Sequence, residues 1–152
     1  MRNLVLRLCL LLVGLLLGGG VMLLVGVQAM FTKNRDVAVE AAPILFDVFQ
    51  YVAIGLSGLA LLGLLFCFKV RGMGVKFAAF LMLIATGAAG YLVGYIMPTM
   101  DRLRATGESG SDAFKNLHGQ SMIVYLALLG ASLLAFVMLS WRVRDEADKS
   151  SA

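Results

Sequence analysis

Four long runs of apolar residues, separated by short polar stretches, dominate the chain. They lie at about 8–31, 44–68, 77–97 and 122–141. Each run is close to the roughly 20 residues that an α-helix needs to cross a ~30 Å hydrocarbon core. The runs are rich in Leu, Ala, Gly and Met, and none shows sustained alternation of apolar and polar residues, which favours helices over strands. The pattern predicts an all-α integral membrane protein, a bundle of four transmembrane helices.

Composition supports this interpretation, because 61% of the 152 residues are hydrophobic and only 14% are charged. Soluble domains are about half apolar. The four spans use nearly the whole chain, so we expect one membrane domain, 1–144, and no separate soluble domain. The polar segment 145–152 is expected to be a frayed cytoplasmic tail.

Basic side chains are unevenly distributed between the two ends of the predicted bundle. With both termini inside, eight basic residues face the cytoplasm and five face outward, as the positive-inside rule requires. The cytoplasmic set is Arg2, Arg7, Lys69, Arg71, Lys76, Arg142, Arg144 and Lys149. We therefore expect a multi-pass protein of a bacterial cytoplasmic membrane with both termini in the cytoplasm. No basic run with interleaved aromatics is present, so nucleic acid is not an expected partner.

The first apolar run has a second interpretation, as a signal peptide. Arg2 and Arg7 resemble a basic n-region, and the segment 27–29 resembles a small-residue cleavage site. The run is longer than the 7 to 15 residues of a typical h-region. We therefore expect it to be retained as the first helix.

The start of the fourth helix is expected before its apolar run. Ser109 and Asp112, three positions apart after a Gly- and Ser-rich stretch, are typical of a helix N-terminus. The helix should begin about two turns before the membrane, with its span at 118–141. Phe114, Leu117 and His118 lie on this projecting start.

Small residues recur at four-residue spacing in three of the predicted helices. Such spacing lets helix backbones approach closely in lipid, where no hydrophobic force drives association. The expected packing residues are Gly14, Gly18, Gly90, Gly94, Ala127, Ala131 and Ala135.

Polar residues within the membrane fall mostly at one level, the outer end of the bundle. Polar groups at membrane depth are costly and mark functional candidates, although interfacial side chains also satisfy headgroups and helix ends. The candidate cluster consists of Asp47, Gln50, Pro98, Asp101, Arg102, His118, Ser121 and Tyr125. Gln28, Tyr51, Tyr95 and Gln120 are placed at the same level.

His118 is the only histidine, and we expect a hydrogen bond to anchor its ring to the end of helix three or the start of helix two. A ligand role for a single haem or metal remains an alternative, but one histidine cannot supply bis-imidazole ligation, and no CxxCH or HExxH motif occurs. No cofactor is expected. Cys9 and Cys67 both lie near the cytoplasmic face and could approach each other, most simply as packing residues.

Two motifs carry a family resemblance. The segment 96–104, Ile-Met-Pro-Thr-Met-Asp-Arg-Leu-Arg, is followed after a polar loop by Phe114-Lys-Asn-Leu117-His118-Gly-Gln-Ser121. Together they resemble the transmembrane protein 205-like family, four-helix membrane domains of unknown function, over roughly 21–141. Pro98, Arg102, His118 and Ser121 match the pattern, whereas Tyr125 stands where members often carry Asn. The resemblance implies a fold and no reaction.

These observations favour a non-enzymatic membrane protein, an accessory, assembly or scaffold component that offers helix faces to other membrane subunits or to itself. No catalytic residue is assigned, because no Ser-His-Asp arrangement, phosphate loop or midplane carboxylate pair is found. The alternative is a small transporter or a metal- or haem-handling protein that uses the outer polar residues around His118. An enzyme acting on a lipid or quinone, with His118 as base, is the third hypothesis.

Overall fold

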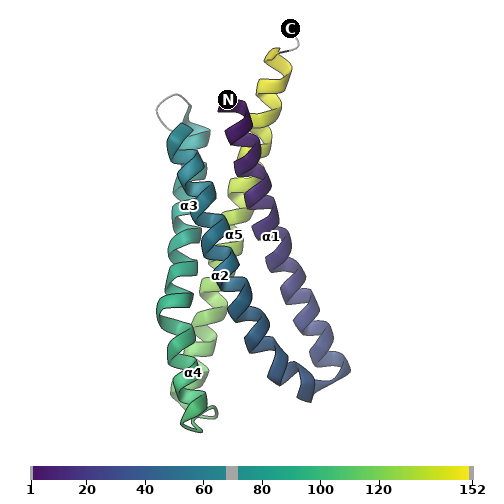
Figure 1. The fold of residues 1–152 in the computed structure, drawn as a ribbon, viewed down its shortest axis with the longest axis vertical. Helices are drawn as coiled ribbons and strands as arrows, with labels where there is room; N and C mark the ends of the chain where they lie inside the picture. Colours follow the sequence, from purple (N-terminus) through teal and green to yellow (C-terminus); the bar gives the residue numbers. More distant parts are fainter. Residues whose placement is uncertain (1, 68–71, 151–152) are drawn as a thin grey trace.

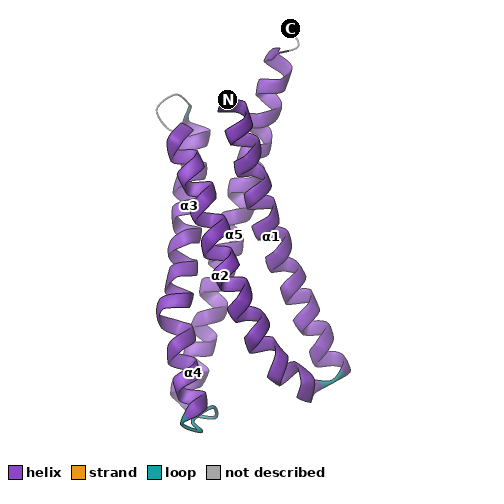
Figure 2. Ribbon diagram, viewed as in Figure 1, coloured by secondary structure: helices purple, strands orange, loops and turns teal. Residues whose placement is uncertain are grey.

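The computed structural model describes residues 2–67 and 72–150, and it describes side chains within 4–67 and 72–145. The described residues form helices and no strand (Figure 2). In chain order the elements are α1 (Arg2–Lys33), α2 (Arg35–Cys67), α3 (Met73–Tyr91), a π-helix η1 (Leu92–Ile96), α4 (Met97–Ala105) and α5 (Asp112–Ser150). The segments α3, η1 and α4 follow one another without a break and act as a single long helix.

Four helical segments are long and apolar enough to cross a membrane, which confirms the predicted all-α, four-helix architecture. They are Leu4–Lys33, Arg35–Cys67, Met73–Ala105 and Asp112–Asp145. Each of them is consistent with a pass through a bilayer. At 1.5 Å per residue, a helix of 33 residues is about 50 Å long, more than the hydrocarbon core requires. The helices extend beyond the predicted apolar runs at every end except the C-terminal end of α2, whose last described residue is Cys67.

The chain termini and the two described connections between helices lie at opposite ends of the bundle. α1 begins and α5 ends at the same end, which we call the terminal end (Figure 1). The α1–α2 connection at Asn34 and the α4–α5 connection lie at the opposite, distal end (Figure 1). Toward the distal end, the α1–α2 hairpin diverges from α3, α4 and α5 (Figure 1).

The connections at the distal end are set by local hydrogen bonds. Asn34 alone separates α1 from α2, and its side-chain oxygen accepts a bond from the Val37 N–H (3.3 Å), which caps α2. After α4, Gly107 has a φ of 77°, and the Glu108 N–H bonds to the Leu103 carbonyl oxygen (2.8 Å). This is a Schellman closure, in which glycine adopts the left-handed conformation without steric cost.

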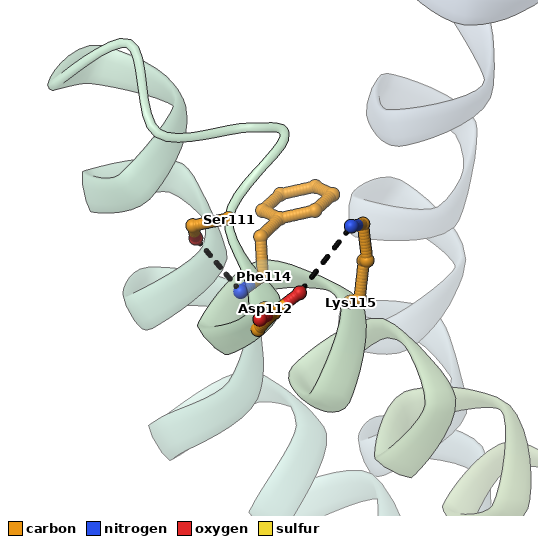
Figure 3. Close-up of polar contacts among 4 residues, drawn as sticks. All are labelled: Ser111, Asp112, Phe114 and Lys115. Atoms are coloured by element: carbon orange, nitrogen blue, oxygen red, sulfur yellow. Dashed lines mark hydrogen bonds and ion pairs between the residues drawn. The ribbon is translucent and has the colours of Figure 1, made fainter.

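The start of α5 lies close to its predicted position but uses a different cap. Ser111, rather than Ser109, accepts the bond from the Phe114 N–H at 3.2 Å (Figure 3). Lys115 and Asp112 form an ion pair at 3.3 Å in the same turn. At its other end α5 continues helically to Ser150, where we had expected a frayed tail.

Four of the seven small residues expected at helix contacts lie at them. A Cβ at Gly14 would be 3.2 Å from the Phe136 ring, and one at Gly90 would be 3.9 Å from Ile54. Ala131 and Ala135 are buried in the core. The other three face outward: Gly18 and Gly94 have no atom within 4 Å of an added Cβ, and Ala127 is exposed.

The closest approaches occur at glycines outside the predicted set. A Cβ at Gly20 would lie 2.5 Å from Leu129, and one at Gly63 would lie 2.6 Å from the Cys9 sulfur. Each of these glycines lets α1 pack closely against a neighbour, α5 in the first case and α2 in the second. For Gly20, the run Gly18–Gly20 in the sequence indicated a close contact of α1. The spacing of the glycines did not show which of the three faces inward.

Candidate functional site

The predicted polar cluster divides into several separate groups. One group is built around Tyr125 on α5, which is 5% exposed. Its hydroxyl donates a hydrogen bond to the Gly20 carbonyl oxygen on α1 (3.0 Å). Phe46 and Phe49 of α2 pack against its ring at centroid distances of 5.6 and 5.9 Å. Tyr125 thus joins three helices, which is a structural role.

Gln50 lies on the same face of α2 as Phe46, one turn closer to the terminal end. It is 3% exposed, and its Oε1 atom is buried with no hydrogen-bond partner. The other two buried polar residues, Ser57 and Ser132, instead donate to carbonyl oxygens of their own helices at 3.4 and 2.8 Å. Gln50 is therefore the one buried polar residue among the described side chains whose side chain forms no hydrogen bond. An unsatisfied polar group is costly at membrane depth.

A second polar group is centred on Arg104 of α4. Its Nη1 forms a salt bridge with Asp101 Oδ1 at 2.6 Å, and its guanidinium lies 5.4 Å from the centroid of the Phe114 ring on α5. Asp47 of α2 interacts electrostatically with both Asp101 and Arg104. These contacts connect the ends of α4 and α5 and extend charge interactions to α2. Arg102, the arginine predicted for the polar cluster, is exposed, and Arg104, which was not predicted, forms the salt bridge instead. The i,i+3 spacing of Asp101 and Arg104 was the signal for this pair.

His118 belongs to neither group, and the prediction that a hydrogen bond anchors its ring to a neighbouring helix is wrong. The side chain is exposed, and within the described part of the chain its imidazole forms no hydrogen bond. Leu117 and Ser121 lie on the partly buried stripe of α5, and His118 is rotated about 100° from Leu117. Tyr125, seven residues later on nearly the same face, is buried, so His118 is exposed because it lies closer to the distal end, where α1 and α2 diverge from α5 (Figure 1). The Ser121 hydroxyl bonds to the His118 carbonyl oxygen (2.7 Å), a contact within the helix.

The remaining predicted polar residues do not lie in the buried core. Gln28, Tyr51, Tyr95, Pro98, Arg102 and Gln120 are exposed. Tyr95 stacks on Tyr91 at a centroid distance of 5.4 Å, on the outer surface of the α3–η1 segment. The distal polar residues are therefore not one cluster. They form a charge network at Arg104, a tyrosine contact at Tyr125 and a buried carboxamide at Gln50.

The helix around Pro98 departs from regular geometry. Proline has no N–H, and its ring clashes with the carbonyl four residues earlier, here that of Gly94. Immediately before Pro98 the chain forms η1, in which the Met97 N–H bonds to the Leu92 carbonyl oxygen. In an α-helix that N–H would bond to Val93. Consequently the carbonyls of Val93 and Gly94 both lack their α-helical donors. We attribute the π-helical turn to this proline.

At the terminal end, Cys9 and Cys67 are both buried free thiols. The Cys9 thiol donates a hydrogen bond to the Ala60 carbonyl oxygen of α2 (3.6 Å), two turns before Cys67. In the part of the chain that the structure describes, no group of three or more His, Cys, Asp or Glu residues is arranged to hold a metal ion.

No family model, curated protein or solved structure matches this chain. The resemblance to the transmembrane protein 205-like family therefore stays a prediction.

Proposed function

We propose that this chain is a non-enzymatic component of a membrane complex, an accessory, assembly or scaffold subunit that binds other membrane subunits or a second copy through its helix faces. The observation that supports this most directly is the outward position of small residues on two different helices. Gly18 on α1 and Ala127 on α5 lie on exposed faces, among large exposed apolar side chains such as Met22 and Ile123.

Small residues on an outer helix face allow another helix to approach closely, which supplies most of the attraction between helices in lipid. A small residue gives no comparable gain in the contacts between the helix and lipid tails. A bulky residue at either position should therefore disrupt binding to a partner while leaving the bundle intact.

The test is native mass spectrometry after extraction in a mild detergent. We expect the chain to be recovered in a stoichiometric complex, with itself or with another membrane subunit, and Gly18→Leu or Ala127→Leu to dissociate it. Leu65→Phe, a change at an exposed position of α2 whose neighbours one turn earlier, Leu61 and Leu62, are large, serves as the control. A monomer without bound subunits, in the wild type as in the variants, would contradict the proposal.

We also propose that both termini are cytoplasmic, in a bacterial cytoplasmic membrane. Support comes from the eight basic residues assigned to the terminal end against five at the distal end. An even number of spans agrees with the common position of the two termini (Figure 1).

A further inference from the structure

The helices α1 and α5 touch along part of their length and separate toward the distal end. A Cβ at Gly14 of α1 would lie 3.2 Å from the Phe136 ring of α5. Closer to the distal end, the Tyr125 hydroxyl of α5 bonds to the Gly20 carbonyl oxygen of α1 (3.0 Å). Further in the same direction, the α1–α2 hairpin diverges from α5 (Figure 1).

His118 lies on the face of α5 that contacts α1. The 18 residues from His118 to Phe136 make about five full turns, so the two side chains leave the helix in the same direction. Tyr125, seven residues after His118, lies within about 20° of that direction. His118 is nevertheless exposed, and within the described part of the chain its imidazole forms no hydrogen bond. It therefore faces the side from which α1 diverges.

Gln28 occupies the matching position on α1. Around the helix axis it lies about 80° from Gly20 and about 40° from Gly14, between the two glycines that contact α5. At 1.5 Å per residue, Gln28 lies about 12 Å beyond Gly20 toward the distal end. His118 lies about 10 Å beyond Tyr125 in the same direction. The two side chains are therefore at one level, on facing sides of separated helices.

This side of α1 is uncovered beyond Gly20. Gln28 is exposed, and Phe31, which lies within about 20° of the Gly20 direction, is 41% exposed. A carboxamide offers both donors and an acceptor, and an imidazole offers at least one donor, so Gln28 and His118 are complementary. Hydrogen bonds between such side chains contribute to helix association in membranes.

Each helix of the hairpin has a weak point near the level of the Tyr125 contacts. In α1 it is the run Gly18–Gly20, because glycine stabilises a helix less than any residue except proline. In α2 it is Pro43, which has no N–H and lies within one turn of Phe46, a contact of the Tyr125 ring. Both helices can therefore bend close to the level at which they leave α5.

We propose that the distal part of the α1–α2 hairpin closes onto α5, and that a hydrogen bond between Gln28 and His118 holds the closed form. The present structure is the open form. Closure covers the α5-facing side of α1, including Phe31, and the exposed His118 side of α5. The motion needs no second subunit, so it is independent of the scaffold role.

The experiment measures the distance between spin labels at Thr32→Cys on α1 and Asn116→Cys on α5, by double electron–electron resonance on the purified protein in lipid nanodiscs. Both positions are exposed and lie outside the proposed pair. The native thiols are only 2% and 1% exposed, so the wild type without introduced cysteines provides the blank. The doubly labelled protein should show two distances, that of the open form and a shorter one in a minority of molecules.

Substitutions in the labelled protein test the hydrogen bond. Gln28→Leu and His118→Leu should each reduce the shorter population about threefold, the effect of one interhelical hydrogen bond in a membrane. Gln120→Leu changes an exposed glutamine of α5 about 200° around the axis from His118, and it should leave both populations unchanged. The open distance alone in the labelled protein would overturn the closure. A shorter population retained in both Gln28→Leu and His118→Leu would overturn the pair as its cause.

Discussion

Gly20 and Gly18 provide a matched pair of positions for testing the packing of α1. Replacing either glycine with alanine in a helix gains about 0.5–1 kcal/mol of backbone propensity. At Gly18 an added Cβ meets no atom within 4 Å. At Gly20 it would lie 2.5 Å from Leu129 Cδ2 and 3.2 Å from both Phe49 Cζ and the Tyr125 hydroxyl oxygen. Normal contacts between carbon atoms are about 3.5–4.0 Å.

The clash at Gly20 requires Leu129, Phe49 and Tyr125 to move, and overpacking of this kind costs about 1–3 kcal/mol. The propensity gain is common to both variants and cancels in their comparison. We therefore expect Gly20→Ala to be about 1–3 kcal/mol less stable than Gly18→Ala, and Gly18→Ala to be at least as stable as the wild type.

The assay is equilibrium unfolding in mixed micelles with an increasing fraction of sodium dodecyl sulfate, followed by far-ultraviolet circular dichroism. Both variants should keep the helical signal of the wild type before unfolding, which controls for misfolding. Equal midpoints for the two variants would refute the close approach of α1 to α5 at Gly20.

Four further predictions concern individual side chains and haem binding. Tyr125→Phe keeps the ring but removes the bond to the Gly20 carbonyl, so the same unfolding assay should show a loss of about 0.5–1 kcal/mol, and an unchanged midpoint would exclude that bond. Ser111→Ala removes the cap of α5 and should cost about 1 kcal/mol, with faster amide hydrogen exchange at 112–115, whereas Ser109→Ala should change neither quantity. His118→Ala should alter stability by less than about 0.5 kcal/mol, because the side chain is exposed without a hydrogen bond. The purified protein should carry no stoichiometric haem, and a Soret band at one haem per chain that is lost in His118→Ala would contradict this.

Apolar runs were sufficient to predict the four helices, because a bilayer requires about 20 apolar residues per span whatever the packing. The helix ends were predicted less well. Hydrogen bonding within α5 continues to Ser150 after hydropathy falls, and its cap is Ser111 rather than Ser109. The π-helical turn was not predicted, although Pro98 was visible in the sequence and explains it. The position of the π-helical turn depends on which backbone carbonyl is displaced by the proline ring.

The environments of the site residues were predicted less well than the helices. Tyr125 and Gln50 were predicted at the outer end of the bundle, but α5 begins at Asp112 and α2 at Arg35, so both residues lie several turns inside their helices. Tyr125 faces α1 and bonds to Gly20, whereas His118, seven residues earlier, is exposed. Seven residues make nearly two full turns, so the two side chains lie within about 20° of the same helix face, and they differ because α1 and α2 diverge from α5 toward the distal end (Figure 1). Their final environments depend on the neighbouring helices, which the sequence does not place.

The most direct test of the central claim, four spans with both termini cytoplasmic, is the labelling of single cysteines by a membrane-impermeant maleimide. Ser109→Cys reports the exposed distal loop without touching the α5 cap, and Asp145→Cys reports the exposed end of α5. The native thiols are only 2% and 1% exposed, so the wild type provides the blank. We predict that Ser109→Cys labels in intact cells, whereas Asp145→Cys labels only after permeabilisation. Labelling of Asp145→Cys alone in intact cells would reverse the topology, and labelling of both variants in intact cells would contradict the four-span bundle.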